Sequence, residues 1–393
     1  MQWEIAIVTQ ILEHRHGLQE LNVKMQNGSV SKAIHYTDDH CQVTVNDQVL
    51  LNTTAVSLKL GTGGYHIVHA AMPRNGEETC EANALSAFEQ VECHSCLFDS
   101  KPIDRSRGHI MKLRYTSLQR PVLAVEEPAS SYHTMFKHRQ SLQGVPVLIG
   151  ELHSMLPAAV CRLQQLSRES GIACRIAYVM SDGGALPIAF SRHIAELRKL
   201  NWLVGTVTYG HAYGGDVEAV NKYTALLAAK HVLQADIVIV TMGPGSVGTG
   251  TRLGFSGLET GELMNASIAL GGFPWLIPRI SFADSRPSHH GISHHTLTVL
   301  QDIAAARCRV VLPDLQHEQG AYLRQQAEQA LLSHKHELEW RIPVSGSLWE
   351  AAVAPYALSI LTMGRGLSAD PTYFAGIGTA VEAAWDYWLE TRN

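Results

Sequence analysis

The chain has 393 residues, of which 46% are hydrophobic and 17% charged, a balance typical of a globular protein rather than a disordered one. Its formal net charge is −5 and neither sign forms long blocks, so nucleic-acid binding through a basic stripe is excluded. A chain of this length exceeds what one hydrophobic core usually serves, and two domains are expected.

Targeting and cysteine patterns indicate a cytoplasmic protein that does not bind a membrane. The segment Met1–Ala6 has neither a basic region nor an apolar run, so we expect no signal peptide. The most apolar stretch, residues 351–363, is too short to span a bilayer and is expected as a buried helix. Seven scattered cysteines do not predict a disulfide framework. Cys93-His94-Ser95-Cys96 lacks a second pair to complete a zinc site; reduced thiols are favoured over a redox or partial metal role.

The first part of the chain is expected to be β-rich. Short strands are predicted over residues 3–10, 21–25, 30–36, 41–45, 48–51, 55–60 and 65–70. Asn27-Gly28 is the strongest hairpin signal among the turns between them. Residues 73–105 are polar and are expected as an irregular insertion or a short helix, with a last strand over 109–115. We therefore predict a small barrel-like domain over residues 1–120.

The pattern changes to alternating strands and helices after about residue 120. Strands are predicted over 122–125, 145–149, 173–180, 202–208, 236–242, 274–281 and 308–312. Helices are predicted over 153–170, 187–200, 217–233, 257–270 and 294–306, with further helices to the end. Such alternation is typical of an α/β domain with a mostly parallel, doubly wound sheet and helices on both faces. This domain is predicted to span residues 121–393.

The expected ligand site lies beyond the carboxyl ends of the strands, where ligands bind in open α/β sheets. Four consecutive ends carry glycine and polar residues, at 181–184, 209–216, 243–252 and 282–296. The candidates for general acid/base or metal-binding roles are Asp182, His211 and Asp284. The candidate ligand-binding residues are Gly183, Gly184, Gly243, Gly245, Ser246, Gly248, Thr249, Arg286, Ser293, His294, His295 and Arg365. The alternative is that these loops carry only the glycines and helix caps that such loops need.

The glycine-rich loop after residue 242 favours a small anionic ligand. Gly243, Gly245 and Gly248 match G-x-G-x-x-G, in which backbone N–H groups approach an anion closely. The acidic residue that would bind a dinucleotide ribose is not well placed, so NAD is the weaker alternative. The chain lacks G-x-x-x-x-G-K-[ST], which excludes a P-loop.

A divalent metal is a further possibility. His289, His290, His294 and His295 lie within seven residues, and Asp182, Asp216 and Asp284 are expected at neighbouring strand ends. Such a set would suit zinc, manganese or iron. Ligand-spaced motifs such as H-E-x-x-H are absent, which favours capping and solvated histidines, with Ser293 as a helix N-cap. A serine nucleophile at Ser246 is the least favoured alternative, because proline at 244 breaks the G-x-S-x-G elbow.

Several strings resemble a bacterial family of unknown function, the domain-of-unknown-function family 3866. They are VLLNTTAV (49–56), LGTGGYH (60–66), GHIMKLRYT (108–116), MSDGGALP (180–187), the 243–251 loop, GISHHT (291–296) and TMGRG (362–366). They cover nearly the whole chain in order. The resemblance implies one full-length architecture and assigns no catalytic role to any position.

Three functional hypotheses follow. The first is a cytoplasmic enzyme acting on a small anionic or phosphorylated metabolite at the strand ends, and it is favoured because polar groups occupy four loops. The second is a non-catalytic protein that senses a metabolite and recruits a partner through the barrel. The third is a structural homo-oligomer, which leaves the Gly, His and Asp loops unexplained.

Overall fold

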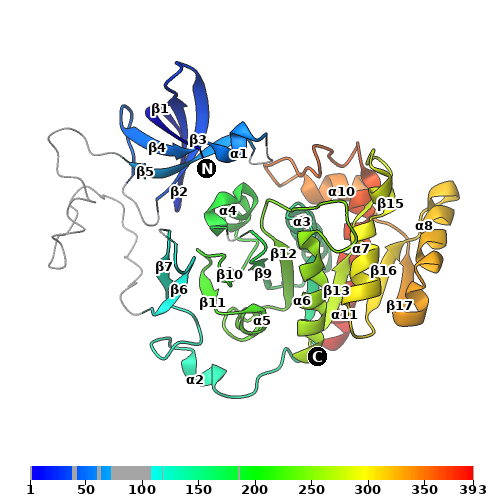
Figure 1. The fold of residues 1–393 in the computed structure, drawn as a ribbon. Coiled ribbons are helices and arrows are strands. Elements are labelled where there is room, and N and C mark those ends of the chain that lie inside the picture. The colour runs from blue at the N-terminus through cyan, green and yellow to red at the C-terminus, as the bar shows by residue number, and fades with distance from the viewer. Residues whose placement is uncertain are drawn as a thin grey trace. The chain divides into compact units, whose positions relative to one another are not determined.

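The computed structural model describes residues 2–37, 42–59, 63–71, 108–116, 118–184 and 186–392. The chain divides into two compact units, Met1–Asp104 and Arg105–Asn393 (Figure 1). The Cys93–Cys96 pair and all of the polar segment 73–105 lie outside the described residues.

The first unit is built on a closed five-stranded barrel, as the sequence predicts. Its strands are β1 (Trp3–Arg15), β2 (Leu18–Lys24), β3 (Val30–Tyr36), β4 (Gln48–Asn52) and β5 (Tyr65–Ala71), joined in the order β1-β2-β3-β5-β4. The antiparallel pair β2–β3 turns at Asn27-Gly28, where Gly28 has a φ of 83° that suits glycine. Alternate side chains such as Val8, Leu21 and Val49 fill the barrel.

Two strands predicted in this unit do not form. Residues 54–57 form the short helix α1 (Thr54–Ser57) instead of a strand over 55–60. The Asn52 side chain accepts a hydrogen bond from the Thr54 amide at 3.1 Å, which turns the chain directly after β4. Residues 42–45, expected as part of a strand, are irregular.

The second unit contains the predicted parallel sheet. Its six strands are β8 (Pro146–Gly150), β9 (Ile176–Ser181), β10 (Gly205–Tyr209), β11 (Val217–Ala219), β12 (Ile237–Met242) and β13 (Phe273–Ile277). They lie in the order β11-β10-β9-β12-β8-β13, and every neighbouring pair is parallel. The carboxyl ends of all six strands therefore lie at one edge.

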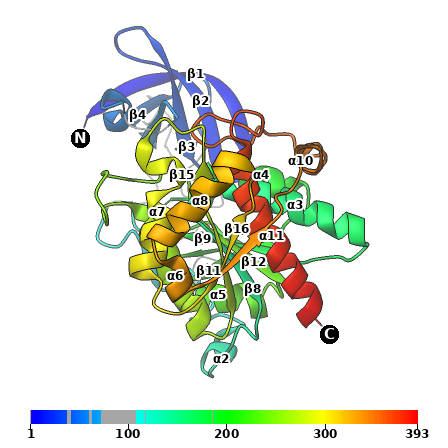
Figure 2. The same ribbon diagram turned by 90° about the vertical axis from the view of Figure 1, so that its right-hand side faces the viewer.

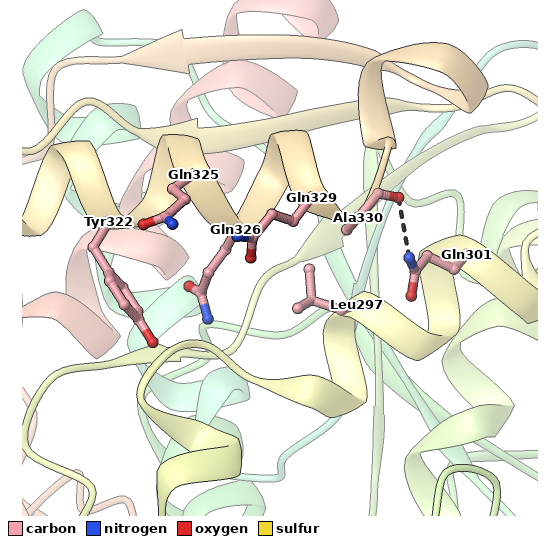
Figure 3. Close-up of a pocket in the computed structure, with 7 residues that line it drawn as sticks. All are labelled: Leu297, Gln301, Tyr322, Gln325, Gln326, Gln329 and Ala330. Carbon is pink, nitrogen blue, oxygen red and sulfur yellow. Dashed lines mark hydrogen bonds between the residues drawn. The ribbon is translucent and has the colours of Figure 1, made fainter.

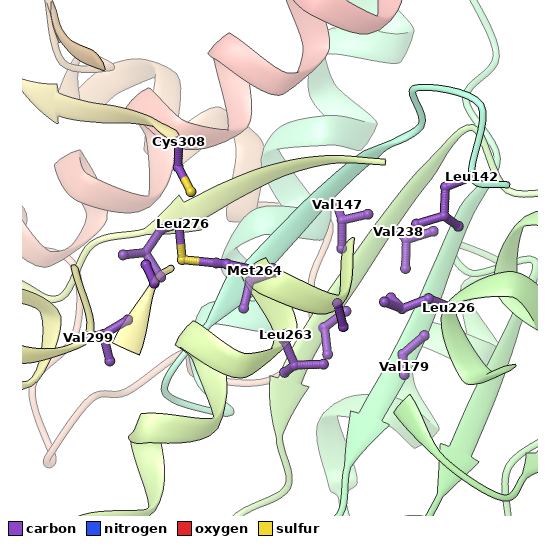
Figure 4. Close-up of a cluster of buried hydrophobic side chains, with 14 of the residues drawn as sticks. Leu142, Val147, Val179, Leu226, Val238, Leu263, Met264, Leu276, Val299 and Cys308 are labelled. Carbon is purple, nitrogen blue, oxygen red and sulfur yellow. The ribbon is translucent and has the colours of Figure 1, made fainter. Parts of the chain in front are cut away.

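Helices cover both faces of this sheet (Figure 2). On one face, α5 (Lys222–His231) and α6 (Glu259–Ala269) pack against alternate strand residues such as Val147 and Val179 (Figure 4). On the other, α3 (Met155–Ser170) and α11 (Pro371–Thr391) pack against Leu148 and its neighbours. The strands are apolar on both sides because both faces are buried.

Shorter elements complete the second unit. The strands are β6 (Ile110–Lys112), β7 (Arg120–Val122), β14 (Ile280–Ser281), β15 (Gly291–Ile292), β16 (Arg309–Pro313) and β17 (Glu337–Arg341). The helices are α2 (His133–Phe136), α4 (Arg192–Lys199), α7 (His294–Thr298), α8 (His317–Gln329), α9 (Leu332–Lys335) and α10 (Gly346–Val353). Three 3₁₀ turns, η3 (Ile188–Phe190), η4 (Ser256–Leu258) and η5 (Pro287–His289), and a π-helical turn, η6 (Val299–Ile303), accompany them. Among the described residues, none of the helices is both long and apolar enough to cross a membrane.

Several predicted boundaries in this unit are wrong. Residues 217–219 form the edge strand β11 rather than the start of a helix, since α5 begins only after its Asn221 capping box. The helix expected from residue 187 begins at Arg192, where the Ser191 hydroxyl caps the Ile194 amide. β17 was missed, and α10 ends ten residues before 363. The strand expected over 109–115 is the short β6, which pairs with β7 in the second unit.

Candidate functional site

The structure gathers the predicted site residues into two groups along the carboxyl edge of the sheet. The β9–β10 group contains Asp182, Gly183, Gly184 and His211. The β8–β13 group contains Asp284, Arg286, Ser293, His294, His295 and Arg365. The glycine-rich loop that follows β12 lies next to both, since added methyl groups on Gly184 and Gly248 would contact Pro244 and His295.

In the β9–β10 group the polar atoms are used to hold backbone. One Asp182 oxygen accepts hydrogen bonds from the amides of His211, at 2.7 Å, and Ala212, at 3.0 Å. A side chain on Gly210, whose φ is 63°, would collide with the same carboxylate. The His211 ring Nδ1 accepts a hydrogen bond from the Leu113 amide at 3.0 Å. These contacts favour a structural role for Asp182 and His211 in shaping the loop after β10.

Removal of this carboxylate tests that role. Asp182→Ala is expected to lower the free energy of unfolding by about 1–3 kcal/mol, because two loop amides lose their acceptor. Urea denaturation of the full-length chain measures the change. Asp182→Asn keeps an acceptor oxygen, so its free energy of unfolding should fall clearly less than that of Asp182→Ala. Equal decreases in the two variants would contradict the structural role.

A buried ion pair lies behind this loop. Lys112, 1% exposed, places its Nζ 2.6 Å from Glu218 Oε2 and 2.6 Å from the Ala212 carbonyl oxygen. Glu218 also accepts from the Thr208 hydroxyl at 2.7 Å. Burial raises the pKa of Glu218, and the Lys112 ammonium opposes that rise. Lys112 Nζ also lies 3.5 Å from the Thr208 carbonyl oxygen, so each of its three donors has an acceptor and the side chain anchors β6 to the sheet edge.

The β8–β13 group is centred on a residue that directly follows β8. Glu151 Oε1 lies 3.0 Å from Arg279 Nη1 and 2.5 Å from His295 Nδ1, and all three side chains are buried. Burial alone would raise the pKa of Glu151, but the hydrogen bond from His295 and the charge of Arg279 hold it below its ordinary value. Glu151 is therefore an ionised carboxylate that fixes the orientation of the His295 ring.

Asp284 is held by three arginines. Its carboxylate lies 2.7 Å from Arg286 Nη2, 3.3 Å from Arg365 Nη2 and 3.8 Å from Arg279 Nη2. Hydrogen bonds from Arg286 hold the pKa of Asp284 well below its usual range, which favours an anchoring role over proton transfer. Arg365 Nε reaches Asp370 at 3.1 Å.

Two further histidines, His289 and His294, lie beside His295. One ring nitrogen from each of His289, His294 and His295 lies within 4.8 Å of the other two. His289 Nδ1 is 2.8 Å from the hydroxyl of Ser293, which also caps α7 as predicted. Burial and then the Arg279 charge lower the pKa of His289 to about 4, and burial also lowers that of His294. The lowered pKa values leave His289 and His294 neutral at neutral pH, the state in which an imidazole can bind a metal.

The glycine-rich loop folds back on itself. Gly248 and Phe255 form an isolated antiparallel β-bridge. The Phe255 ring stacks on the His295 ring, with centroids 3.7 Å apart. The loop does not lead directly into α6, whose first turn carries Glu259 and Glu262 and is thus unfavourable for an anion. Among the described residues, none is hydrogen-bonded to the Ser246 hydroxyl, so a serine nucleophile gains no support.

A cavity of about 270 Å³ lies between this loop and the end of β8. Its lining includes Glu151, His153, His193, residues 243–246 and residues 361–363. His153 Nε2 lies 2.6 Å from the Ser191 hydroxyl, and burial lowers the pKa of His153 to about 3. The turn over 362–365 that forms one wall also carries Arg365.

A second cavity, of about 490 Å³, lies along α8 (Figure 3). Its lining is mostly amides, from Gln301, Gln325, Gln326 and Gln329, together with Tyr322. Gln326 accepts from the Ile292 amide at 2.7 Å and donates to the His290 carbonyl at 3.1 Å. Gln326 thereby positions the segment from which the histidines project.

Sequence reasoning missed Glu151, His153 and Arg279. The signal for the first two was available, because they follow the predicted strand 145–149 and the rule applied to four other strand ends applies there too. Arg279 was hidden inside a strand predicted over 274–281, whereas β13 ends at Ile277.

The fold and this edge define a class: a protein with a small closed barrel and a parallel α/β unit that has a buried charged centre at its strand ends. A family model described as protein of unknown function (DUF3866) matches residues 32–381. The chain belongs to this family, as the resemblance implied. A search of curated proteins found no match.

Proposed function

We propose that this chain is an enzyme that acts on a small anionic metabolite bound at the carboxyl ends of β8, β12 and β13. The observation that supports this most directly is the Glu151–His295 pair, whose 2.5 Å contact is buried next to the cavity lined by the glycine-rich loop. Pockets with a few convergent polar groups are the usual location of active sites in α/β proteins.

The pair gives His295 a defined chemical state. In the neutral ring, donation from Nδ1 to the carboxylate leaves the lone pair on Nε2, where it can accept a proton or bind a metal. Gly248 lies beside this ring, where an added methyl group would be in ordinary van der Waals contact, 3.8 Å from Nε2. A buried imidazole oriented in this way is characteristic of reactive centres.

The arginines of the β8–β13 group support an anionic ligand. Arg286 keeps 48% of its side chain exposed while it is paired with Asp284. Arg365 is part of the group and is the last residue of the turn over 362–365, whose first residues line the cavity. Arginine presents several donors in a planar fork, which suits carboxylates and phosphates.

A ligand screen by thermal unfolding tests the proposal. Full-length protein, both metal-free and zinc-supplemented, would be heated with carboxylates, sugar phosphates and nucleotides. A ligand at 100 times its Kd stabilises the native state by about 2.7 kcal/mol, a visible shift. The shift should be lost in Arg365→Gln and kept in Arg324→Gln, an exposed arginine paired with Asp314.

Two results would contradict the proposal. One is a hit that Arg365→Gln leaves unchanged, which places the ligand elsewhere. The other is a screen in which no compound of these classes shifts the transition. A ligand that binds at this site but is never turned over would support the sensing role instead.

A further inference from the structure

We propose that His289, His294 and His295 form a divalent transition-metal site, with zinc as the metal and a fourth coordination position open to water or to an anionic oxygen of the substrate. The inference deepens the proposed function, since it names the cofactor and the group that the substrate anion would meet. It does not depend on turnover, because metal binding is measured on the protein alone.

The ligand geometry supports this assignment. One nitrogen from each ring falls within 4.8 Å of the other two. Zinc–nitrogen bonds of about 2.0–2.1 Å place tetrahedral ligands roughly 3.4 Å apart, so shifts of about 1 Å or less per ring would complete the site. His289 ends η5, and His294 and His295 begin α7. Three ligands thus come from one seven-residue segment.

The partners of the rings support it independently. Metal-bound histidines almost always donate their second ring nitrogen to a carboxylate, a carbonyl or another polar group, which fixes the tautomer. His295 Nδ1 is already bonded to Glu151 at 2.5 Å, and His289 Nδ1 to Ser293 at 2.8 Å. In both rings Nε2 remains for a metal.

The charges around the cluster indicate what the fourth ligand is. Glu151, Asp284 and Asp370 are matched by Arg279, Arg286 and Arg365 in one network of ion pairs. The three imidazoles are neutral ligands, so a bound dication leaves a local excess of positive charge. A hydroxide or an anionic substrate group offsets it. Three protein ligands with one open position are typical of catalytic rather than structural zinc sites.

His290 provides a matched control within the same segment. Its ring packs edge-on against Phe282 and Tyr322, and it is not part of the cluster. Replacement of His290 therefore perturbs the same stretch of chain without removing a proposed ligand. His294 is the mildest ligand to remove, because its side chain is partly exposed whereas His289 and His295 are buried.

The test is a titration of chelator-treated, full-length protein with Co²⁺, followed by its visible absorption, and with Zn²⁺ by calorimetry. We expect one equivalent of Co²⁺ to bind, with the visible bands of a low-coordinate nitrogen and oxygen site. Glu151→Gln removes a residue that orients a ligand and should weaken metal binding by about 10–100-fold. His294→Ala removes a ligand itself and should weaken metal binding by more than that. His290→Ala should bind as the parent does. Thermal unfolding without metal shows whether each variant is folded.

Other outcomes overturn the site. Failure of the unaltered protein to bind either ion at stoichiometric concentration does so without reference to any variant. Binding that survives His294→Ala places the ion at another site, and a near-ultraviolet charge-transfer band of a cobalt thiolate identifies cysteines as its ligands. The protein could bind neither ion and, in its metal-free form, still show a ligand-induced thermal shift that Arg365→Gln abolishes. In that case the proposed function stands and only the metal site is disproved.

Discussion

Replacement of Glu151 by alanine is expected to lower the free energy of unfolding by about 3–5 kcal/mol, because it leaves a buried guanidinium without its closest partner. Among the described residues, Asp284 at 3.8 Å would be the one carboxylate still paired with Arg279, and His295 would lose the hydrogen bond that orients it. Urea denaturation of the full-length chain measures the change. Asp314→Ala, which breaks an exposed pair with Arg324, should cost less than about 1 kcal/mol. If Glu151→Ala lowered the free energy of unfolding by as little as Asp314→Ala, the stabilising role of the buried Glu151–Arg279 pair would be contradicted.

The same carboxylate predicts a pH dependence. The folded pKa of Glu151 is depressed, so its ionised pair stabilises the protein above the unfolded pKa, and that stability is lost as the pH falls through the folded value. The stability difference between the parent and Glu151→Gln should therefore be largest near neutral pH and shrink in acid. A difference that stays constant down to strongly acidic pH would show that the charge is not involved.

Lys112→Met should have an effect of similar size at the opposite side of the sheet edge. The variant leaves Glu218 ionised in a largely buried position, which is expected to cost about 3–5 kcal/mol in the free energy of unfolding. The double variant Lys112→Met with Glu218→Gln removes both charges and should recover much of the loss. Denaturant titrations of the four proteins give the coupling energy between the two side chains.

The shift of the folded pKa has the opposite sign at Glu218. Burial raises the folded pKa of Glu218, and loss of the ammonium raises it further. Protonation then relieves the buried charge, so the destabilisation in Lys112→Met should decrease as the pH is lowered below neutral. A penalty that is independent of pH, together with no recovery in the double variant, would show that the pair contributes only by packing.

Hydrophobic patterns were sufficient to predict the architecture. Runs such as Val147–Ile149 and Ile237–Val240 are apolar at every position, which indicates strands buried on both faces. The hairpin at Asn27-Gly28 follows from backbone preferences alone. The errors arose where side-chain hydrogen bonds to the backbone compete with the hydrophobic pattern. Asn52 starts a turn where an apolar pattern suggested a strand. Asn221 caps a helix that begins five residues after its predicted start. Such capping contacts are weak signals in a single sequence.

The candidate site was only partly predictable. The strand-end rule identified Asp284, His294 and His295, but it did not distinguish them from Asp182 and His211, whose polar atoms are used by loop backbone. That distinction depends on which groups meet in space. Glu151 and His295 are 144 residues apart in the chain, and no local pattern joins them.

The strand order has a consequence for how the chain folds. β8 ends at residue 150, yet its two neighbours are β12, which begins at Ile237, and β13, which begins at Phe273. During synthesis β8 has no partner in this sheet until a large part of the remaining chain has left the ribosome. Pairings of such long range are slow to form and expose apolar strands meanwhile. A chain truncated before residue 237 should therefore be prone to aggregate, with α3 formed beside a strand that has nothing to join.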